Sequence, residues 1–475
     1  MNARIDHQIL LRFVWLLGIV AWMLTDGSMV AAKPPNILIF LVDDLGWSDV
    51  GFHGGSIPTP HIDRLAAAGT RLEAFYVQNL CSPTRAALLT GRYPIRHGLQ
   101  LSVVRPWARY GLPLEERTLA DALKQVGYTT AIAGKWHLGH VSQNYLPTHR
   151  GFDHQYGHYN GAIDYLEHTR DGGFDWHRDD QVCKDEGHAT ELIGKEAIRL
   201  INQQPKDKPL FLYVPFNAPH TPLQAMERDL EALRGVEPRN RRIYSAMVLG
   251  VDRMIGQIME AIKSKGWADQ TLVVFSADNG GPIGAGATNG TLRAGKGTPY
   301  EGGVRAAAFA TWPGVIPAGK ALNEPLHVVD WYPTLVRLAG GSLDQPLPID
   351  GKNLWPALTE QAPSPHEEIL LHAAPGVAAI RCGKWKLIGK WGRDAKDPDT
   401  NSASMIPNDP VDWELYDLLD DPAEETNLAE AEPHQVEAMK KFLLKYQEAA
   451  VPPRNKPKPP NFLAPAVWGQ FPASN

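Results

Sequence analysis

The segment with the clearest chemical signature begins at Cys81, in the sequence Cys-Ser-Pro-Thr-Arg, and an apolar run follows it. A proline two residues after the cysteine is typical of the first turn of a helix, where its missing N–H has no intrahelical partner. The free N–H groups of that turn and the positive end of the helix dipole favour an anionic ligand beside Cys81. Arg85, about one turn further on, adds a planar fork that suits an oxyanion. A small buried structural cysteine is the alternative interpretation.

Acidic and amide side chains follow two apolar runs elsewhere in the chain. Asp43 and Asp44 come directly after residues 36–42, whose continuous apolar character predicts a strand buried on both faces. Asp278 and Asn279 follow a second such run. Ligands bind at the carboxyl ends of strands in α/β folds, and adjacent carboxylates repel unless a cation lies between them. Four oxygen ligands indicate a hard cation, Ca²⁺ before Mg²⁺, whereas a solvated turn is the alternative for each pair.

Basic and imidazole groups recur in comparable positions. Residues 128–133 predict a strand that ends near Lys135 and His137, and two residues that are two apart on extended backbone point to the same side. His220 follows a further predicted strand, and Lys296 lies in a glycine-rich stretch that permits close backbone approach. Lys296 is therefore a candidate positive charge on the side of the site from which the leaving group of a substrate would depart. Structural turn histidines are the alternative for both imidazoles.

The elements that must position these groups fit one large α/β domain and a smaller one, as expected for 475 residues. Residues 240–263 predict an amphipathic helix with a core-facing stripe. From about residue 366 the pattern changes to a small α+β subdomain, with strands predicted over 378–388 and 413–418 and a helix over 433–449. Loop-rich residues 140–190 are interpreted as a substrate-facing rim. The predicted organisation is a signal at 1–32, a large domain at 33–365, the α+β subdomain at 366–450 and a proline-rich tail at 451–475.

The first 32 residues have the pattern of a secretory signal. Arg4 and Arg12 precede an apolar stretch at 13–24, and small residues precede a cleavage site before Lys33. The apolar stretch is short for a membrane span, and no other stretch qualifies as one. We therefore expect an exported protein, in a periplasmic, secreted or lysosome-like compartment, with no stable membrane span after cleavage. An uncleaved anchor is the alternative.

Composition limits the classes of partner. A formal net charge of −6 and the lack of a basic stripe argue against a nucleic-acid partner. Three cysteines cannot make a disulfide framework. If Cys81 is reserved for chemistry, Cys183 and Cys382 either pair or remain free thiols.

The cysteine segment, residues 81–92, resembles the C-x-P-x-R signature of type I sulfatases, in which the cysteine is converted to formylglycine (3-oxoalanine). Residues 127–137 match the second signature of that family, G-Y-x-T-x-x-x-G-K-W-H, at every position. The resemblance covers most of the mature chain and is closest to the arylsulfatase B-like (N-acetylgalactosamine-4-sulfatase) subgroup. Further matching segments lie at 43–47, 146–153, 278–281, 300–305 and 327–336.

This resemblance implies an alkaline-phosphatase-like fold, in which helices flank a large mixed sheet. It also implies that Asp43, Asp44, Asp278 and Asn279 ligate Ca²⁺, with the modified Cys81 completing the site. The implied catalytic roles are these: Arg85 stabilises the nucleophile, Lys135 and Lys296 bind the sulfate, His137 acts on the formylglycine, and His220 faces the leaving oxygen.

The implied activity is hydrolysis of sulfate esters, exo-acting on a sulfated sugar such as N-acetylgalactosamine 4-sulfate and also on aryl sulfates. A formylglycine-generating enzyme is the implied partner during maturation. Two alternatives remain open. One is a phosphate or phosphonate monoester hydrolase of the same superfamily, and the other is a non-catalytic binder of sulfated glycans in which Cys81 is unmodified.

Overall fold

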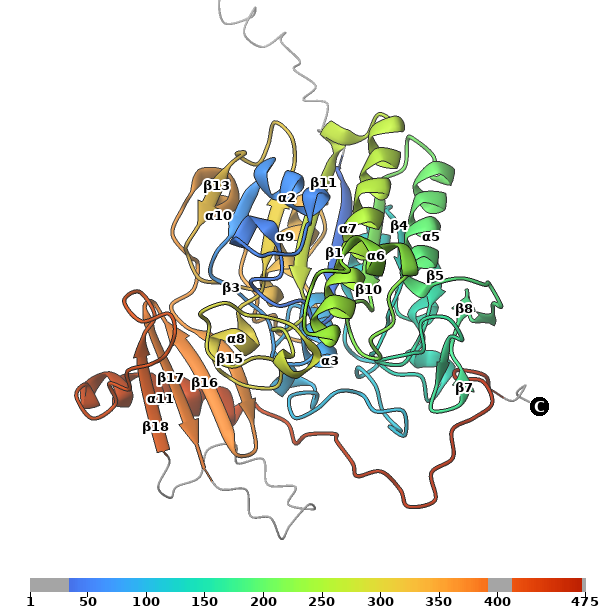
Figure 1. Ribbon diagram of the computed structural model, residues 1–475. Coiled ribbons are helices and arrows are strands. Elements are labelled where there is room, and N and C mark those ends of the chain that lie inside the picture. Colours follow the sequence, from blue (N-terminus) through green and yellow to red (C-terminus); the bar gives the residue numbers. More distant parts are fainter. Residues whose placement is uncertain (1–33, 392–411, 472–475) are drawn as a thin grey trace, which may run out of the picture. The chain divides into compact units, whose positions relative to one another are not determined.

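A ten-stranded mixed sheet forms the centre of the molecule and carries helices against it (Figure 1). The structure, a computed structural model, describes residues 34–391 and 412–471, so the predicted signal at 1–32 lies outside the described residues. Neighbouring strands β11, β1, β10, β4 and β5 run parallel, and antiparallel strands extend the sheet on both sides. In sheet order the strands are β13 (Lys320–Leu322), β2 (Thr70–Leu72), β12 (Ala308–Thr311), β11 (Thr271–Ala277), β1 (Asn36–Val42), β10 (Leu210–Phe216), β4 (Thr129–Ala133), β5 (His154–Gly157), β8 (His177–Arg178) and β9 (Gln181–Val182).

The three central strands are buried along their whole length. Every residue of β1, β10 and β11 is buried, as their apolar runs predict for a sheet covered on both faces. Parallel pairing aligns Val42 of β1 with Ala277 of β11 and Phe216 of β10. The carboxyl ends of these strands are therefore level, and the polar residues that follow them reach the same edge.

Two groups of helices pack around the sheet. Helix α7 confirms the predicted amphipathic helix at 240–263, and its apolar stripe is buried. Helix α5 lies beside α7, and α2 also packs against it, whereas α3, α4 and α9 contact one another. The bounds of these helices are α2 (Pro60–Ala67), α3 (Cys81–Thr90), α4 (Leu119–Gln125), α5 (Ala189–Gln203), α7 (Arg239–Ser264) and α9 (Trp331–Leu338).

A four-stranded antiparallel sheet and helix α11 (Pro433–Glu448) form the C-terminal α+β part. One prediction here is wrong, because residues 378–388 do not make a single strand. The turn at Gly383, where φ is 55°, divides them into the two arms of a hairpin. In sheet order the strands are β15 (Ile369–Ala374), β16 (Val377–Cys382), β17 (Trp385–Lys390) and β18 (Asp412–Asp417).

A buried ion network joins this C-terminal sheet to the large domain. The Lys386 side chain of β17 is fully buried, and its Nζ lies 3.0 Å from a carboxylate oxygen of Glu301 and 2.8 Å from one of Glu424. Glu301 begins the short helix α8 (Glu301–Val304) of the large domain. One ammonium group is therefore shared by two buried carboxylates from the two parts of the chain, and Arg305 also lies 3.5 Å from Glu301.

Replacing Lys386 with methionine is expected to lower the free energy of unfolding by about 3–5 kcal/mol, because both carboxylates lose their ammonium partner in a buried site. Denaturant titration measures the change. The control is Lys384→Met, because Lys384 pairs with Asp417 at the surface with 46% of its side chain exposed, and there we expect a much smaller effect. Equal losses in the two variants would contradict this account of the network.

The C-terminal tail returns from α11 to the large domain (Figure 1). The Val451 N–H donates to the carbonyl of Ile95 at 2.8 Å, and Val467 forms an isolated bridge with Phe174. Trp468 is buried there. The proline-rich tail predicted at 451–475 thus contacts the large domain at several of its described residues, while the predicted domain boundaries stay predictions.

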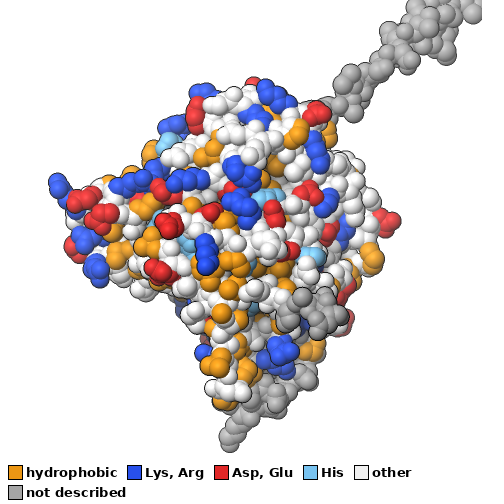
Figure 2. All heavy atoms as spheres, turned by 90° about the vertical axis from the view of Figure 1, so that its right-hand side faces the viewer, with side chains coloured by type: hydrophobic (Ala, Val, Ile, Leu, Met, Phe, Trp, Pro, Cys, Tyr) orange, Lys and Arg blue, Asp and Glu red, His pale blue; other side chains and the backbone are white. Residues whose placement is uncertain are grey.

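Figure 2 shows acidic and basic side chains interspersed over one face. Cys81, Cys183 and Cys382 are all free, so the open possibility of a Cys183–Cys382 pair is not realised. Within residues 34–391 and 412–471, no helix has both the length and the apolar character that a membrane crossing needs.

Candidate active site

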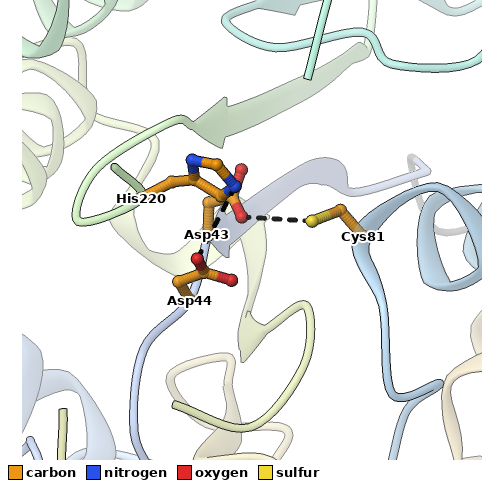
Figure 3. A group of neighbouring side chains, drawn as sticks. All are labelled: Asp43, Asp44, Cys81 and His220. Carbon is orange, nitrogen blue, oxygen red and sulfur yellow. Dashed lines mark hydrogen bonds and ion pairs between the residues drawn. The ribbon is translucent and has the colours of Figure 1, made fainter. Parts of the chain in front are cut away.

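Acidic residues meet at the carboxyl edge of the central sheet. Asp43 and Asp44 leave the end of β1, as Figure 3 shows, and Asp278 leaves the end of β11. The Asp44 N–H donates to Oδ1 of Asp278 at 3.2 Å, and the Asp44 backbone has a φ of 65°. Tyr244 of α7 fixes this turn, because its hydroxyl donates to the Asp44 carbonyl at 2.9 Å and accepts from the Gly46 N–H at 3.0 Å. The sequence showed Tyr244 only as part of an apolar stripe.

Cys81 is the first residue of α3, as its Ser-Pro sequence predicts. The preceding Leu80 is extended and makes no side-chain cap, so the N-terminus of the helix is left for other partners. The thiol is buried and donates to Oδ1 of Asp43 at 3.5 Å. Burial, followed by the Asp43 carboxylate, raises the pKa of the Cys81 thiol to about 12. The unmodified side chain is therefore a protonated thiol at neutral pH and a weak nucleophile.

Arg85 and Lys135 neutralise the carboxylates of Asp43 and Asp278. The Arg85 side chain is fully buried, and its Nη2 lies 2.7 Å from Oδ2 of Asp278 and 3.3 Å from Oδ2 of Asp43. Lys135, also fully buried, pairs with Asp43. Burial alone would raise the pKa of the Asp43 carboxyl. The positive charges of Lys135, followed by His220 and Arg85, together lower it by more, so the pKa of Asp43 lies below its usual value. Burial, followed by Asp43, raises the pKa of Asp278 to about 6.

His220 and Lys296 both lie close to the Asp44 carboxylate. The Nε2 atom of His220, which follows β10, lies 3.7 Å from Oδ2 of Asp44, and Figure 3 shows its ring directed at the acidic pair. The Nζ atom of Lys296 lies 2.5 Å from Oδ1 of Asp44. Burial lowers the pKa of His220 more than Asp44 raises it, so a proton bound to this imidazole is more acidic than usual.

His137 closes the site on the α3 side with a strained backbone, since its φ is 59°. Its Nε2 contacts the Val104 carbonyl at 3.1 Å, whereas its buried Nδ1 has no partner among the described residues. The Ser82 hydroxyl donates to the His137 carbonyl at 2.9 Å. Burial, followed by Lys135, lowers the pKa of His137 well below its usual value. A neutral, positioned imidazole can accept a proton.

Gly161 lies directly against the His137 ring. A Cβ atom at Gly161 would stand 2.2 Å from Cε1 and 2.3 Å from Nε2 of His137, which is closer than such atoms can approach. No local sequence signal marks this glycine, because the contact joins two loops of the large domain. Its lack of a side chain is thus a requirement of the site.

The Gly161→Ala variant is expected to hydrolyse an aryl sulfate about 100-fold more slowly. The reason is that the new methyl group displaces the His137 ring, and a displacement of a catalytic group by about 1 Å can lower the rate by about that factor. Steady-state kinetics measure the loss, and thermal unfolding reports whether the fold is kept. Gly235→Ala is the matched control, since a Cβ atom there meets no atom within 4 Å. A Gly161→Ala enzyme with the activity of the control would contradict the placement of His137.

A cavity of about 210 Å³ opens above these groups. Cys81, His137, His220 and Lys296 line it, whereas Arg85 and Lys135 are fully buried against the carboxylates. All ten predicted site residues therefore lie in one cluster, four of them on the cavity wall. The geometry places Lys135 beside Asp43 and leaves Lys296 as the lysine that lines the cavity.

The donor set fits a hard divalent cation. Ligand atoms of Asp43, Asp44, Cys81 and His220 lie within 4.8 Å of one another. The Asn279 amide donates to Oδ1 of Asp44 at 2.8 Å, while its own Oδ1 is buried with no partner among the described residues. Clustered carboxylate oxygens and an orphaned amide oxygen are the ligands that Ca²⁺ and Mg²⁺ accept. The presence of His220 in this group was not part of the predicted ligand set.

Comparison with known proteins defines the class of enzyme. The family model described as Sulfatase matches residues 35–342, more than half of the chain. The chain therefore belongs to the sulfatase family, and it is a sulfuric ester hydrolase.

Individual relatives agree with this assignment. The chain is 35% identical to arylsulfatase J of Mus musculus, across 94% of this chain and 82% of the relative, and 37% identical to arylsulfatase A of Homo sapiens, across 90% of each. The crystal structure of Ps i-CgsB in complex with k-i-k-neocarrahexaose aligns with a TM-score of 0.79 and 32% identity, over 89% of this chain and 94% of that chain. The predicted alkaline-phosphatase-like fold with a C-terminal α+β subdomain is confirmed.

Proposed function

We propose that this sulfatase removes sulfate from the end of a sulfated sugar chain, with Cys81 oxidised to formylglycine and Ca²⁺ held by the acidic cluster. The observation that carries the proposal is the position of Cys81, at a helix N-terminus, on the wall of a cavity shared with His137, His220 and Lys296. The protonated thiol is a weak nucleophile, which favours a modified side chain at this position.

The hydrated formylglycine would supply two hydroxyls on one carbon, one to attack the sulfur and one whose deprotonation releases the sulfate. Arg85 and Lys135 neutralise the charge of the carboxylates and hold them in place around position 81. Arg85 would also stabilise the nucleophilic oxygen through its planar fork.

Proton movements are assigned to the two imidazoles. His220, in its protonated form and with Lys296 beside the same carboxylate, would donate a proton to the departing alcohol oxygen, and its lowered pKa makes that proton easy to release. His137 is neutral, and its buried Nδ1 has no partner among the described residues, so it would take the proton of the second hydroxyl. Lys296 would bind a sulfate oxygen at the cavity wall, and Lys135 would add positive charge beneath it.

Asp43, Asp44, Asp278 and Asn279 would hold the Ca²⁺ ion, together with the side chain at position 81. When bound, the ion would supply positive charge against the sulfate and the nucleophilic oxygen. Export, cleavage of the signal at 1–32 and action of a formylglycine-generating enzyme on Cys81 complete the proposal for maturation. The arylsulfatase B-like subgroup and N-acetylgalactosamine 4-sulfate stay our prediction for the natural substrate.

The wild-type enzyme is expected to hydrolyse an aryl sulfate with a kcat/KM about 100-fold or more above that for the matching aryl phosphate. The reason is that the donor set with Asn279 suits one hard cation, and a single cation suits a monoanionic ester. Steady-state rates on the two esters with the same leaving group measure the ratio. A ratio below one would instead support a phosphate or phosphonate monoester hydrolase. Absence of turnover with retained glycan binding would support a non-catalytic binder.

A further inference from the structure

A patch of aromatic and cationic side chains adjoins the mouth of the cavity. We call it the rim patch, and it consists of Arg105, Trp107, Lys458 and Phe462. Arg105 itself lines the cavity, so the patch continues the cavity wall outward. Its Cζ lies 6.0 Å from the centroid of the Trp107 ring, and Nζ of Lys458 lies 5.6 Å from the ring centroids of both Trp107 and Phe462.

Two segments that are far apart in the sequence build this patch. Arg105 and Trp107 belong to the loop before α4, whereas Lys458 and Phe462 belong to the C-terminal tail. The Trp107 Nε1–H donates to the Lys456 carbonyl at 3.1 Å, and the rings of Trp107 and Phe462 meet edge to face at 6.2 Å. The tail is therefore held against the loop, and the patch is organised before any ligand arrives.

The two positive charges of the rim patch lack an acidic partner among the described residues. No carboxylate of the described residues lies within 4.0 Å of the charged nitrogens of Arg105 or Lys458. Arg170 also lines the cavity, but this cation is paired, because its Nε lies 3.6 Å from a carboxylate oxygen of Asp171. In a chain of net charge −6, uncompensated cations at one mouth favour an anionic ligand there.

We propose that the rim patch binds the sugar next to the one that carries the scissile sulfate, and that this neighbouring sugar carries an anionic group. The two aromatic rings offer apolar surface for a sugar face, and Arg105 and Lys458 pair with a carboxylate or a second sulfate. The substrate class is therefore a polyanionic oligosaccharide. This inference rests on the proposed function, because the cavity beside the patch must hold the reacting sulfate ester.

The test compares Arg105→Ala, Lys458→Ala and Phe462→Ala with the wild-type enzyme on three substrates. These are an aryl sulfate, an oligosaccharide with a terminal sulfate ester beside an anionic sugar, and the same oligosaccharide with a neutral sugar in that place. Each variant is expected to raise the KM for the anionic oligosaccharide about 10-fold, with a smaller change in kcat, as expected for loss of a binding contact. The two charge variants should affect the neutral oligosaccharide less than the anionic one.

Lys456→Ala is the matched control, because it removes a positive charge from the same tail while the Lys456 carbonyl keeps its contact with Trp107. The inference is overturned if this control weakens oligosaccharide turnover as much as Lys458→Ala does. It is also overturned if the patch variants lose as much on the aryl sulfate, or if the charge variants lose as much on the neutral oligosaccharide. Failure of the wild-type enzyme to hydrolyse any sulfate ester would instead refute the proposed function.

Discussion

The Cys81→Ala variant is expected to lose turnover of an aryl sulfate by about 10⁴-fold or more, the range seen when an enzyme nucleophile is deleted. The reason is that alanine has no group that can attack sulfur, while the cation site and the two imidazoles remain. The fold should persist, because removing one sulfur atom from a helix start creates only a small cavity. Initial rates and thermal unfolding measure the two effects.

Cys183→Ala provides the matched control, since Cys183 is a free, half-buried thiol outside the cavity wall. It should keep wild-type rates. A Cys81→Ala enzyme that retains a substantial fraction of wild-type activity would refute the assignment of position 81 as the nucleophile. Retained binding of a sulfated glycan by the inactive variant would agree with the assignment.

Removal of divalent cations is expected to lower activity by about 10³-fold, comparable to the loss of a principal electrostatic group at a transition state. Arg85 and Lys135 are buried against the carboxylates, so the cation would supply the positive charge that faces the sulfate and the nucleophilic oxygen. Added Ca²⁺ should restore activity and stabilise the protein by about 2.7–4.1 kcal/mol at 100 to 1,000 times its Kd. Activity assays and thermal unfolding before and after chelation measure both effects.

The Asn279→Ala variant distinguishes a specific loss of cation binding from general damage to the protein. It removes the orphaned amide oxygen without adding charge, so it should raise the Ca²⁺ concentration needed for half-maximal activity. Elemental analysis of the active protein identifies the bound ion. Full activity in protein shown to be free of divalent metal would contradict the proposed site.

The central site could be predicted because its signals are local. Six apolar residues, 37–42, followed by Asp43 and Asp44 indicate a buried strand and its polar end without any knowledge of the partner strands. Cys81 followed by a proline likewise marks a helix start. Parallel pairing then makes the ends of β1, β10 and β11 level, and this register brings Asp278 and His220 to the same place.

The remaining features depend on contacts between distant segments, which no local pattern reveals. Gly161 is needed because a loop passes over the His137 ring, and Tyr244 is needed because α7 crosses behind the acidic turn. The tail at Lys458 joins a loop about 350 residues earlier, so the rim patch has no signature in either segment alone. The hairpin within 378–388 was missed because its strand-forming residues continue on both sides of a short turn.

The most direct test of the account is mass spectrometry of the tryptic peptide 72–85 from protein of known specific activity. We expect this peptide to carry an aldehyde at position 81, with the thiol sulfur replaced by oxygen and two hydrogens lost. The modified fraction should rise in proportion to the specific activity across preparations. Fully active enzyme in which position 81 is an ordinary cysteine would contradict the account.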